Sequence, residues 1–423
     1  MWLLNKMLQK LVRKGELIVV DYDGKTWRYG APDPTHGPIT VRLTDRGAAF
    51  AIASDPRLGT GEAYMDGRLV VEPPHDVRDL LLWARYNAPF ERPSALKPKG
   101  PLRKAAAAIV GRIDQINWRS RSRRNAEHTY NLTRRLYELF LDEDRQYTCA
   151  YYRDITNNLE QAQLDKKAHI ASKLYLKPGM KVLDVGCGWG GMALYLHRHY
   201  DVDVLGVALA PDQIAFAKER AEAAGVADRV KFELMDYRDV QGQFDRITSA
   251  GLIEHLGTPH YPGFFSHMHR LLKEDGVMFS HCCGRMGPPG LTDAWTRKYI
   301  FPGGYIPSLS ELVTEAEKNQ LIVSDVEAMR YHYAHTLEEW YYRTNAARDE
   351  IIALYDERFF RMWQFYLAGA EAAFRYGGLV NWQLQYVKRR DAIPMTRDYM
   401  FEEESRLWSL EEPPEWHLSR AAE

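Results

Sequence analysis

From residue 160 onward, short apolar runs alternate with longer segments of helical periodicity. Strands separated by helix-length segments indicate a parallel sheet with right-handed crossovers. We therefore predict an α/β, doubly wound domain whose ligands gather at the carboxyl ends of its strands. The predicted strands are 181–186, 203–209, 230–236, 244–251 and 276–281, and the predicted helices are 160–174, 192–200, 211–225 and 261–272.

The chain on either side of this stretch has a different pattern. Residues 15–77 hold short alternating runs, LIVVDY, WRYG, ITVRL and AAFAIA, separated by turn residues, and a helix is predicted at 77–86. Aromatic residues over 337–387 predict long helices. We expect a small α+β domain at 1–88, a linker at 89–127, the doubly wound domain with helical lid insertions at 128–400, and an acidic tail at 401–423.

Two N-terminal segments carry basic charge. In residues 1–14 an apolar helical face beginning at Trp2 is flanked only by lysine and arginine, which is typical of an interfacial membrane helix and equally of a helix packed on its own domain. The linker has ten basic and three acidic residues. Anionic lipid and nucleic acid both attract such a segment, and the absence of interleaved aromatic residues favours lipid. A solvated basic helix stays possible.

Composition narrows the class of protein. The 423 residues exceed one ordinary domain, and 45% hydrophobic with 27% charged residues describe a globular protein. The four cysteines show no C-x-x-C spacing, so we expect no metal site, no disulfide framework and a reducing, cytoplasmic setting. No apolar run approaches the roughly 20 residues that span a bilayer. The protein is expected to be soluble or peripheral.

The stretch KVLDVGCGWGG, residues 181–191, joins a buried strand to a helix through a glycine-rich turn. Gly186, Gly188 and Gly190 allow a tight turn and close approach to a ligand. An acid, Asp184, precedes the glycines. Such a turn serves several cofactors and is weak evidence by itself. The pattern resembles motif I of class I S-adenosylmethionine-dependent methyltransferases, whose fold is Rossmann-like.

Seven segments in order resemble the cyclopropane fatty acyl phospholipid synthases and their mycolic acid relatives. The resemblance covers about residues 15–400 and implies transfer of a methylene group from S-adenosylmethionine to the cis double bond of a phospholipid acyl chain. It also implies a bound bicarbonate as the base. The segments are LGTGEAYMDG (58–67), DRQYTCAYY (144–152), LDVGCGWGG (183–191), GLIEHLG (251–257), SHCCG (280–284), WTRKYIFPGGYIPS (295–308) and HYAHTLEEWY (332–341).

The resemblance also implies the site residues. The bicarbonate would be held by the side chains of Cys149, Glu254, His281 and Tyr333 and by the main-chain amide of Cys283. Taken singly, Cys149 is equally a small buried hydrophobe and His281 a core histidine. The expected cofactor contacts are Tyr147, Thr148, Asp184, Gly186, Cys187, Gly188, Gly190, Ala208, Gln213, Asp236 and Tyr237.

The implied partner is a phospholipid bilayer with unsaturated acyl chains, reached at the inner face of the membrane through anionic lipid at the N-terminal helix and the linker. A homodimer is expected, and no nucleic acid. The chain departs from the family pattern at 129–137, TYNLTRRLY, and at Cys283, where isoleucine is common. These differences leave open a methyl-branched product, a non-catalytic lipid-binding protein or, from the basic linker, a nucleic-acid methyltransferase.

Overall fold

The computed structural model describes residues 1–34, 37–92 and 132–411. The chain forms two compact units, each built from segments far apart in sequence. No described helix is both long and apolar enough to cross a bilayer. Unit 1 comprises Met1–Asp114, Gly290–Gly304 and Tyr333–Val380, and unit 2 comprises Gln115–Pro289, Tyr305–His332 and Asn381–Glu423, as far as these ranges are described.

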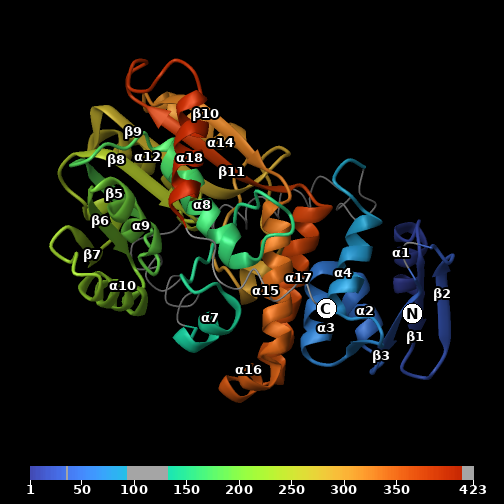
Figure 1. The fold of residues 1–423 in the computed structure, drawn as a ribbon. Coiled ribbons are helices and arrows are strands. Elements are labelled where there is room, and N and C mark those ends of the chain that lie inside the picture. The colour runs from blue at the N-terminus through green and yellow to red at the C-terminus, as the bar shows by residue number, and fades with distance from the viewer. Residues whose placement is uncertain (35–36, 93–131, 412–423) are drawn as a thin grey trace. The chain divides into compact units, whose positions relative to one another are not determined.

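Unit 2 is organised around a seven-stranded sheet of order β10-β11-β9-β8-β5-β6-β7 (Figure 1). The pairs β5–β6, β5–β8, β6–β7 and β8–β9 are parallel, which confirms the predicted doubly wound fold. Register brings Asp184 opposite Thr248 and Ala250 opposite His281. The strands are β5 (Lys181–Val185), β6 (Asp203–Ala208), β7 (Val230–Leu234), β8 (Phe244–Ala250), β9 (Leu272–Arg285), β10 (Ile322–Met329) and β11 (Leu379–Val387).

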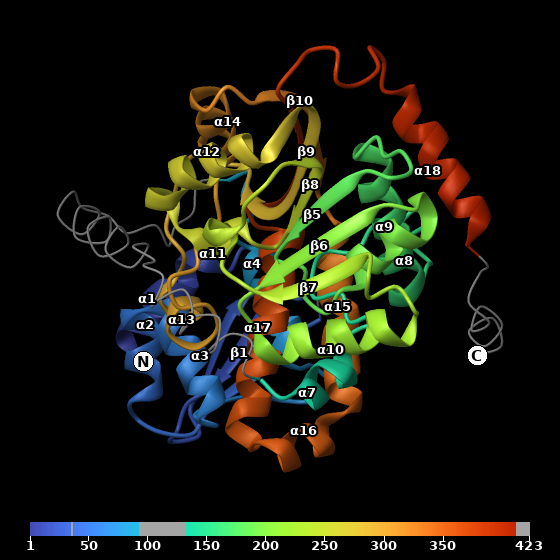
Figure 2. The ribbon, with the colours of Figure 1, turned by 90° about the vertical axis from the view of Figure 1, so that its left-hand side faces the viewer.

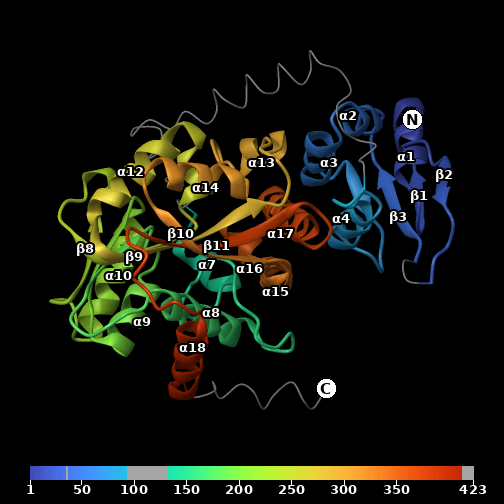
Figure 3. The same cartoon turned by 90° about the horizontal axis from the view of Figure 1, so that it is seen from above.

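Helices cover both faces of this sheet (Figures 2 and 3). On one face lie α8 (Leu159–Lys173), α9 (Gly191–Tyr200), α10 (Pro211–Ala223) and α18 (Asp398–Leu410), which share one buried apolar cluster with the strands. On the other lie α12 (Tyr261–Leu271) and α14 (Leu309–Lys318). The shorter elements of this unit are α7 (Arg134–Phe140), α11 (Ile253–Leu256) and the 3-10 turns η1 (Tyr237–Asp239) and η2 (Thr258–His260).

The prediction that helices run to residue 387 is wrong at its end, because residues 379–387 form β11, which lies inside the sheet beside β9. Almost every side chain of β11 is buried on both faces, including Asn381, Gln383 and Gln385. A strand covered on both faces has no apolar–polar alternation to reveal it. Its partner β10 runs antiparallel to it.

Unit 1 contains a four-stranded sheet of order β2-β1-β3-β4, with β1 parallel to β3. The sheet and the helix predicted at 77–86 are confirmed, the latter as α4 (Val77–Tyr86) with an Asp76–Asp79 capping box. The run AAFAIA, interpreted as extended, is helical and forms most of α2, whose N-cap is Gly47; the Asp45 side chain accepts the amides of Gly47 and Ala48 at its start. The other elements are β1 (Glu16–Val20), β2 (Thr26–Gly30), β3 (Ile39–Leu43), β4 (Leu69–Val71), α2 (Ala48–Ser54) and α3 (Pro56–Met65).

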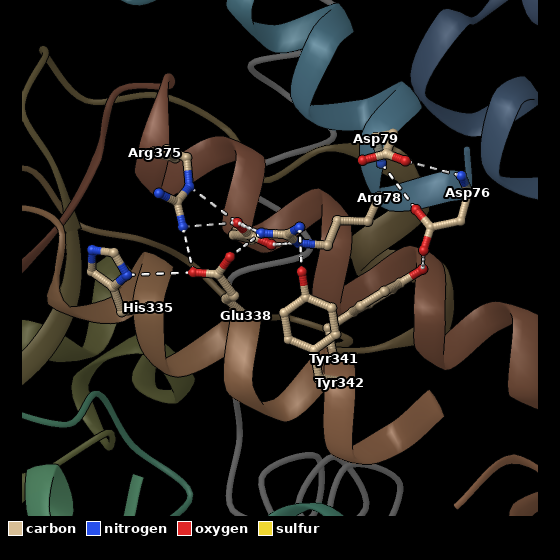
Figure 4. A network of polar contacts seen from close by, with 9 residues as sticks. Asp76, Arg78, Asp79, His335, Glu338, Tyr341, Tyr342 and Arg375 are labelled. Atoms are coloured by element: carbon tan, nitrogen blue, oxygen red, sulfur yellow. Dashed lines mark hydrogen bonds and ion pairs between the residues drawn. The ribbon is translucent and has the colours of Figure 1, made fainter. Parts of the chain in front are cut away.

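Helices from the second half of the chain complete unit 1, so the structure divides the chain differently from the predicted domains. Helix α17 packs on α3 and α4, and α13 packs on α3. A polar network joins α4 to α15 and α17 (Figure 4): Arg78 binds the buried Glu371 as well as Glu338, and Arg375 binds both glutamates. The helices are α13 (Ala294–Tyr299), α15 (His332–Ala346, from Tyr333 in this unit), α16 (Arg348–Leu354) and α17 (Glu357–Arg375).

Both chain ends bear on the sequence predictions. Helix α1 (Trp2–Leu11) buries Leu4, Leu8 and Leu11 in the core of unit 1, whereas Trp2 and Leu3 are 69% and 40% exposed. Much of the predicted acidic tail lies outside the described residues, but its start belongs to α18, where Leu407 is buried. The basic linker, apart from residues 89–92, also lies outside the described chain.

Candidate active site

The glycine turn follows β5 at the carboxyl edge of the sheet in unit 2. Gly186, Gly188 and Gly190 all have positive φ, and Gly190 caps α9. A Cβ on Gly190 would lie 2.8 Å from the Cβ of Ala217, so this glycine permits helix packing. A Cβ on Gly188 would meet no atom within 4 Å. The turn is therefore packed behind Gly190 and open above Gly188, as a close-lying cofactor requires.

Asp184, one residue before the end of β5, is buried and has no hydrogen-bond partner for Oδ2. Burial raises the pKa of its carboxyl group to about 7. An orphaned buried acceptor needs a donor to offset its desolvation, and a ligand above the turn can supply one. Cys187 lies between Gly186 and Gly188 in the turn; it is buried, and its amide donates to the carbonyl oxygen of Val207. Its side chain packs against the sheet.

The segment 146–149 lies beside the carboxyl end of β8. Thr148 lies close to Gly251, where an added Cβ would be 3.2 Å from Thr148 Cγ2. The ring of Tyr147 contacts Tyr137 and Phe140 of α7 edge-on, at centroid distances of 5.5 and 5.9 Å. Both expected cofactor contacts are thus held by packing at the edge where the turn lies.

The remaining expected cofactor residues follow β6 and β7. Ala208 ends β6, and Gln213 is buried in the first turn of α10. Asp236 follows β7 and caps η1 by accepting the Arg238 amide, and both its carboxylate oxygens also accept from the Arg238 side chain. Its contact with the cofactor stays a prediction. The neighbouring Tyr237 is buried, with its ring edge-on to Phe264. All these residues lie at the carboxyl edges of neighbouring parallel strands.

Glu254 and Cys283 meet at the carboxyl end of β9. The amide of Cys283 donates to Glu254 Oε1 at 2.5 Å, while Glu254 Oε2 is buried without a hydrogen-bond partner. Burial raises the pKa of the Glu254 carboxyl group to about 7. The pair expected to bind an anion together therefore bind each other in this structure, through an acid that titrates near neutrality.

His281 lies inside the sheet and is almost completely buried. Its Nε2 lies 2.7 Å from Asn381 Nδ2 and its Nδ1 lies 3.1 Å from Gln383 Nε2. A neutral imidazole has one donor and one acceptor, so one of the two amides must present its oxygen to the ring. Because Lys173 donates to Gln383 Oε1, that amide is already oriented, and Asn381 is the one that turns. Burial lowers the pKa of His281 well below its ordinary value, so the ring is neutral.

Cys149 is buried, and its Sγ contacts the carbonyl oxygen of Ala150 at 3.3 Å. Burial also raises the pKa of the Cys283 thiol, with the Glu254 carboxyl group adding to the effect. The Cys283 sulfur is therefore a protonated thiol and not a nucleophile. Cys149, Glu254, His281 and Cys283 all belong to unit 2.

Tyr333 belongs to unit 1, where its ring packs against Trp340 and Phe374 at centroid distances of 5.8 and 4.8 Å. Its role as an anion ligand stays a prediction. Among the described residues, no group of three or more His, Cys, Asp or Glu side chains could hold a metal ion.

Sequence reasoning missed the buried polar residues that hold expected site residues in place by hydrogen bonds. Lys166 of α8 donates to Thr148 Oγ1 at 2.8 Å, and the amides of Asn381 and Gln383 hold His281. Lys166 falls on a helix whose other face is also buried, a pattern that could have marked it as unusual. The amides lie on β11, which the sequence analysis placed in a helix.

Comparison with known proteins matches most of the chain to a single family. The family model of mycolic acid cyclopropane synthetase matches residues 118–384. The cyclopropane-fatty-acyl-phospholipid synthase of Escherichia coli K12 is 37% identical over 352 residues, 82% of this chain and 88% of that protein. The tuberculostearic acid methyltransferase of Mycobacterium tuberculosis is 30% identical over 413 residues, 91% of this chain and 90% of its own length.

A solved structure agrees with these matches. The mycolic acid cyclopropane synthase CmaA1, in complex with S-adenosylhomocysteine and a detergent, superposes with a TM-score of 0.60 at 32% identity, covering 62% of this chain and 97% of that one. The chain belongs to the mycolic acid cyclopropane synthetase family and is an S-adenosylmethionine-dependent methyltransferase.

Proposed function

We propose that this enzyme adds a methylene group across the cis double bond of an unsaturated acyl chain in a membrane phospholipid, forming a cyclopropane fatty acid with bound bicarbonate as the base. The single observation that carries the proposal is the buried Glu254 carboxyl group at the carboxyl end of β9, bonded to the Cys283 amide and with its second oxygen unpartnered. The 37% identity to the synthase of Escherichia coli supports the choice of substrate class.

The residues of this chain suit a reaction that needs a dry pocket more than a strong nucleophile. The cofactor supplies an electrophilic methyl group, and an alkene that takes it becomes a carbocation which must then lose a proton. The Cys283 thiol is protonated, and both ring nitrogens of His281 are held by side-chain amides, so neither group competes for the methyl group as a nucleophile. Closure of the cyclopropane ring then needs only a base held close to the new methyl group.

Glu254 can serve an anion in two ways. As a carboxylate it accepts from the hydroxyl of bicarbonate, and when protonated it donates to a bicarbonate oxygen. The raised pKa makes both forms accessible near neutral pH. In either case Glu254 must release the Cys283 amide, which then becomes available to the anion. We propose that this exchange opens the site.

The alternative product is a methyl-branched fatty acid. The similarity to a tuberculostearic acid methyltransferase over 91% of the chain favours it as the second candidate. Both products begin with the same methyl transfer and differ in how the carbocation is resolved. Neither the non-catalytic nor the nucleic-acid alternative has an observation in its favour of comparable weight.

We further propose that the enzyme works at the inner face of the membrane, with α1 and the basic linker contacting anionic lipid, and that it acts as a homodimer. The exposed Trp2 and Leu3 on a helix with basic side chains support the lipid contact. Light scattering of the full chain tests the dimer, and a monomer mass would reject it.

The deciding experiment incubates purified enzyme with S-adenosylmethionine and vesicles of unsaturated phospholipid, followed by analysis of the acyl chains. Cyclopropanation adds CH2 and removes the double bond, whereas a methyl-branched alkene retains it. Mass spectrometry combined with an ozonolysis assay separates the two. Acyl chains without added mass would reject both candidates, and added mass with a retained double bond would select the second.

A further inference from the structure

Lys166 is a buried lysine that the proposed reaction has not yet used. It lies on α8 in unit 2, is 1% exposed, and donates from Nζ to Gln146 Oε1 at 2.7 Å and to Thr148 Oγ1 at 2.8 Å. Both acceptors are neutral. They belong to the segment that continues directly into Cys149, so the ammonium group supports the expected cofactor and anion ligands from behind.

The other lysines of α8 contrast with Lys166. Lys167 pairs with Asp144 at 2.8 Å, and Lys173 pairs with Glu327. Within the described chain Lys166 makes no such ion pair. Burial lowers its pKa to about 8, and Asp142 and Asp144 favour its charged form from a longer distance. A buried charge is costly unless it is paired. A further negative group close to Lys166 would therefore stabilise its buried charge.

The charge of Lys166 reaches the residues expected around the anion. After burial, it is the strongest influence that lowers the pKa of His281, and it also acts on Cys149. The expected ligands themselves carry no positive charge, because two are thiol-bearing residues, one is a neutral histidine, one is an acid and one is a tyrosine. An anion in a dry pocket with only neutral donors lacks a counter-charge.

We propose that Lys166 is the electrostatic positioning residue that supplies this counter-charge to the bound bicarbonate. This inference rests on the proposed function, since it assumes that the enzyme binds bicarbonate. Lys166 Nζ then has two roles. It holds the Gln146 and Thr148 side chains by hydrogen bonds, and it compensates the negative charge of an ion bound next to the segment 146–149.

The test measures methyl transfer against bicarbonate concentration in buffer stripped of carbon dioxide, with the full-length enzyme and phospholipid vesicles. Lys166→Met removes the charge at similar length, Lys166→Gln removes it but retains a hydrogen-bond donor, and Lys166→Arg retains it. Lys167→Met is the matched control, because it removes a buried lysine one position along the same helix. Binding of S-adenosylhomocysteine is measured by calorimetry for each variant.

We expect the neutral variants to need at least about tenfold more bicarbonate for half-maximal rate, and Lys166→Arg and Lys167→Met to stay within about threefold of the wild type. S-adenosylhomocysteine affinity should be unchanged in Lys166→Arg and Lys167→Met, and in the neutral variants, which release Thr148, it should fall by less than the affinity for bicarbonate. If Lys166→Met does not fold, Lys166→Gln and Lys166→Arg decide the matter.

Unchanged bicarbonate dependence in a folded neutral variant would overturn the proposal. So would a loss of S-adenosylhomocysteine affinity without a change in bicarbonate dependence, which would assign the charge to the cofactor. A wild-type enzyme that modifies acyl chains without any bicarbonate dependence would instead refute the base in the proposed function, and that result is visible before any variant is made.

Discussion

The main-chain amide of Cys283 donates a 2.5 Å hydrogen bond to the carboxyl group of Glu254, whose second oxygen has no hydrogen-bond partner. The two residues come from α11 and β9, which are neighbours at the carboxyl edge of the sheet. An anion that used the Cys283 amide would compete with Glu254 for it. The protonation of Glu254 therefore bears on both stability and anion binding.

Glu254→Gln should change how stability depends on pH. Burial raises the folded-state pKa of Glu254 from an ordinary 4.5 to about 7. Its stabilising contribution is present below pH 4.5, falls as the pH rises towards 7, and is absent above that. The difference in unfolding free energy, variant minus wild type, should therefore increase by about 3 kcal/mol when the pH is raised from 4.5 to 7.5. Denaturant titration of the cofactor-free proteins at several pH values measures the difference.

The glutamine retains an acceptor for the Cys283 amide, so the comparison isolates the titration. Parallel pH profiles for the two proteins would mean that Glu254 is solvated and ionised throughout. The same variant should also lose activity, because it can neither ionise nor donate a carboxyl proton to an anion.

Gly188 and Gly190 should respond differently to alanine. Gly190→Ala places a Cβ 2.8 Å from both Ala217 and Phe232 at a φ of +84°, and we expect a loss of about 2–4 kcal/mol in unfolding free energy. Gly188→Ala meets no neighbouring atom and should cost about 1 kcal/mol. Its methyl group projects into the open space above the turn, so affinity for S-adenosylhomocysteine should fall by at least about tenfold.

Calorimetry and thermal unfolding on the same two samples check this pair of outcomes. A folded Gly188→Ala variant with wild-type affinity would show that the cofactor does not approach this glycine. The contrast matters because both residues belong to one motif and only the surrounding packing distinguishes them.

The sequence predicted the parallel part of the sheet because its strands are apolar runs, most of them separated by helices of ordinary length. It failed at β11, where Asn381, Gln383 and Gln385 are buried as amides within the sheet and mask the strand pattern. The glycine turn was predictable because few residues other than glycine adopt a positive φ without strain. The pairing of Glu254 with the Cys283 amide was not, because it depends on the meeting of two segments 29 residues apart.

Arg78→Ala should destabilise unit 1 strongly. Glu371 is fully buried and is held by Arg78 through two hydrogen bonds, of 2.5 and 2.8 Å, and by Arg375 at 3.0 Å (Figure 4). Removing Arg78 leaves a buried carboxylate with one partner, and we expect a loss of about 3–5 kcal/mol. Arg358→Ala, which breaks an exposed pair with Asp66, should cost less than about 1 kcal/mol.

A double variant separates charge from packing in that network. Arg78→Met with Glu371→Leu removes both charges and retains apolar volume, so it should recover part of the stability lost by Arg78→Ala. Urea unfolding of the three proteins provides the comparison. A double variant less stable than Arg78→Ala would show that Glu371 still stabilises the unit without Arg78, through its hydrogen bond from Arg375.

Helix α1 should divide into a structural and a membrane-contacting face. Leu8 is buried in the core of unit 1, so Leu8→Ala should cost about 2–5 kcal/mol in unfolding free energy. Trp2 and Leu3 are largely exposed, with the Lys6 ammonium 4.1 Å from the Trp2 ring centroid. The double variant Trp2→Ala with Leu3→Ala should retain stability within about 0.5 kcal/mol. It should lower partitioning onto anionic vesicles by about tenfold or more.

Vesicle co-sedimentation at two salt concentrations distinguishes the apolar from the charged contribution. Lys6→Gln with Lys10→Gln should weaken binding at low salt, by about 1 kcal/mol for each lysine, and have less effect at high salt. The Trp2 and Leu3 variant should be weakened at both concentrations, because burial of apolar surface is not screened. Wild-type vesicle binding by both double variants would exclude α1 as the membrane contact and leave the basic linker, whose charge could then be tested in the same assay.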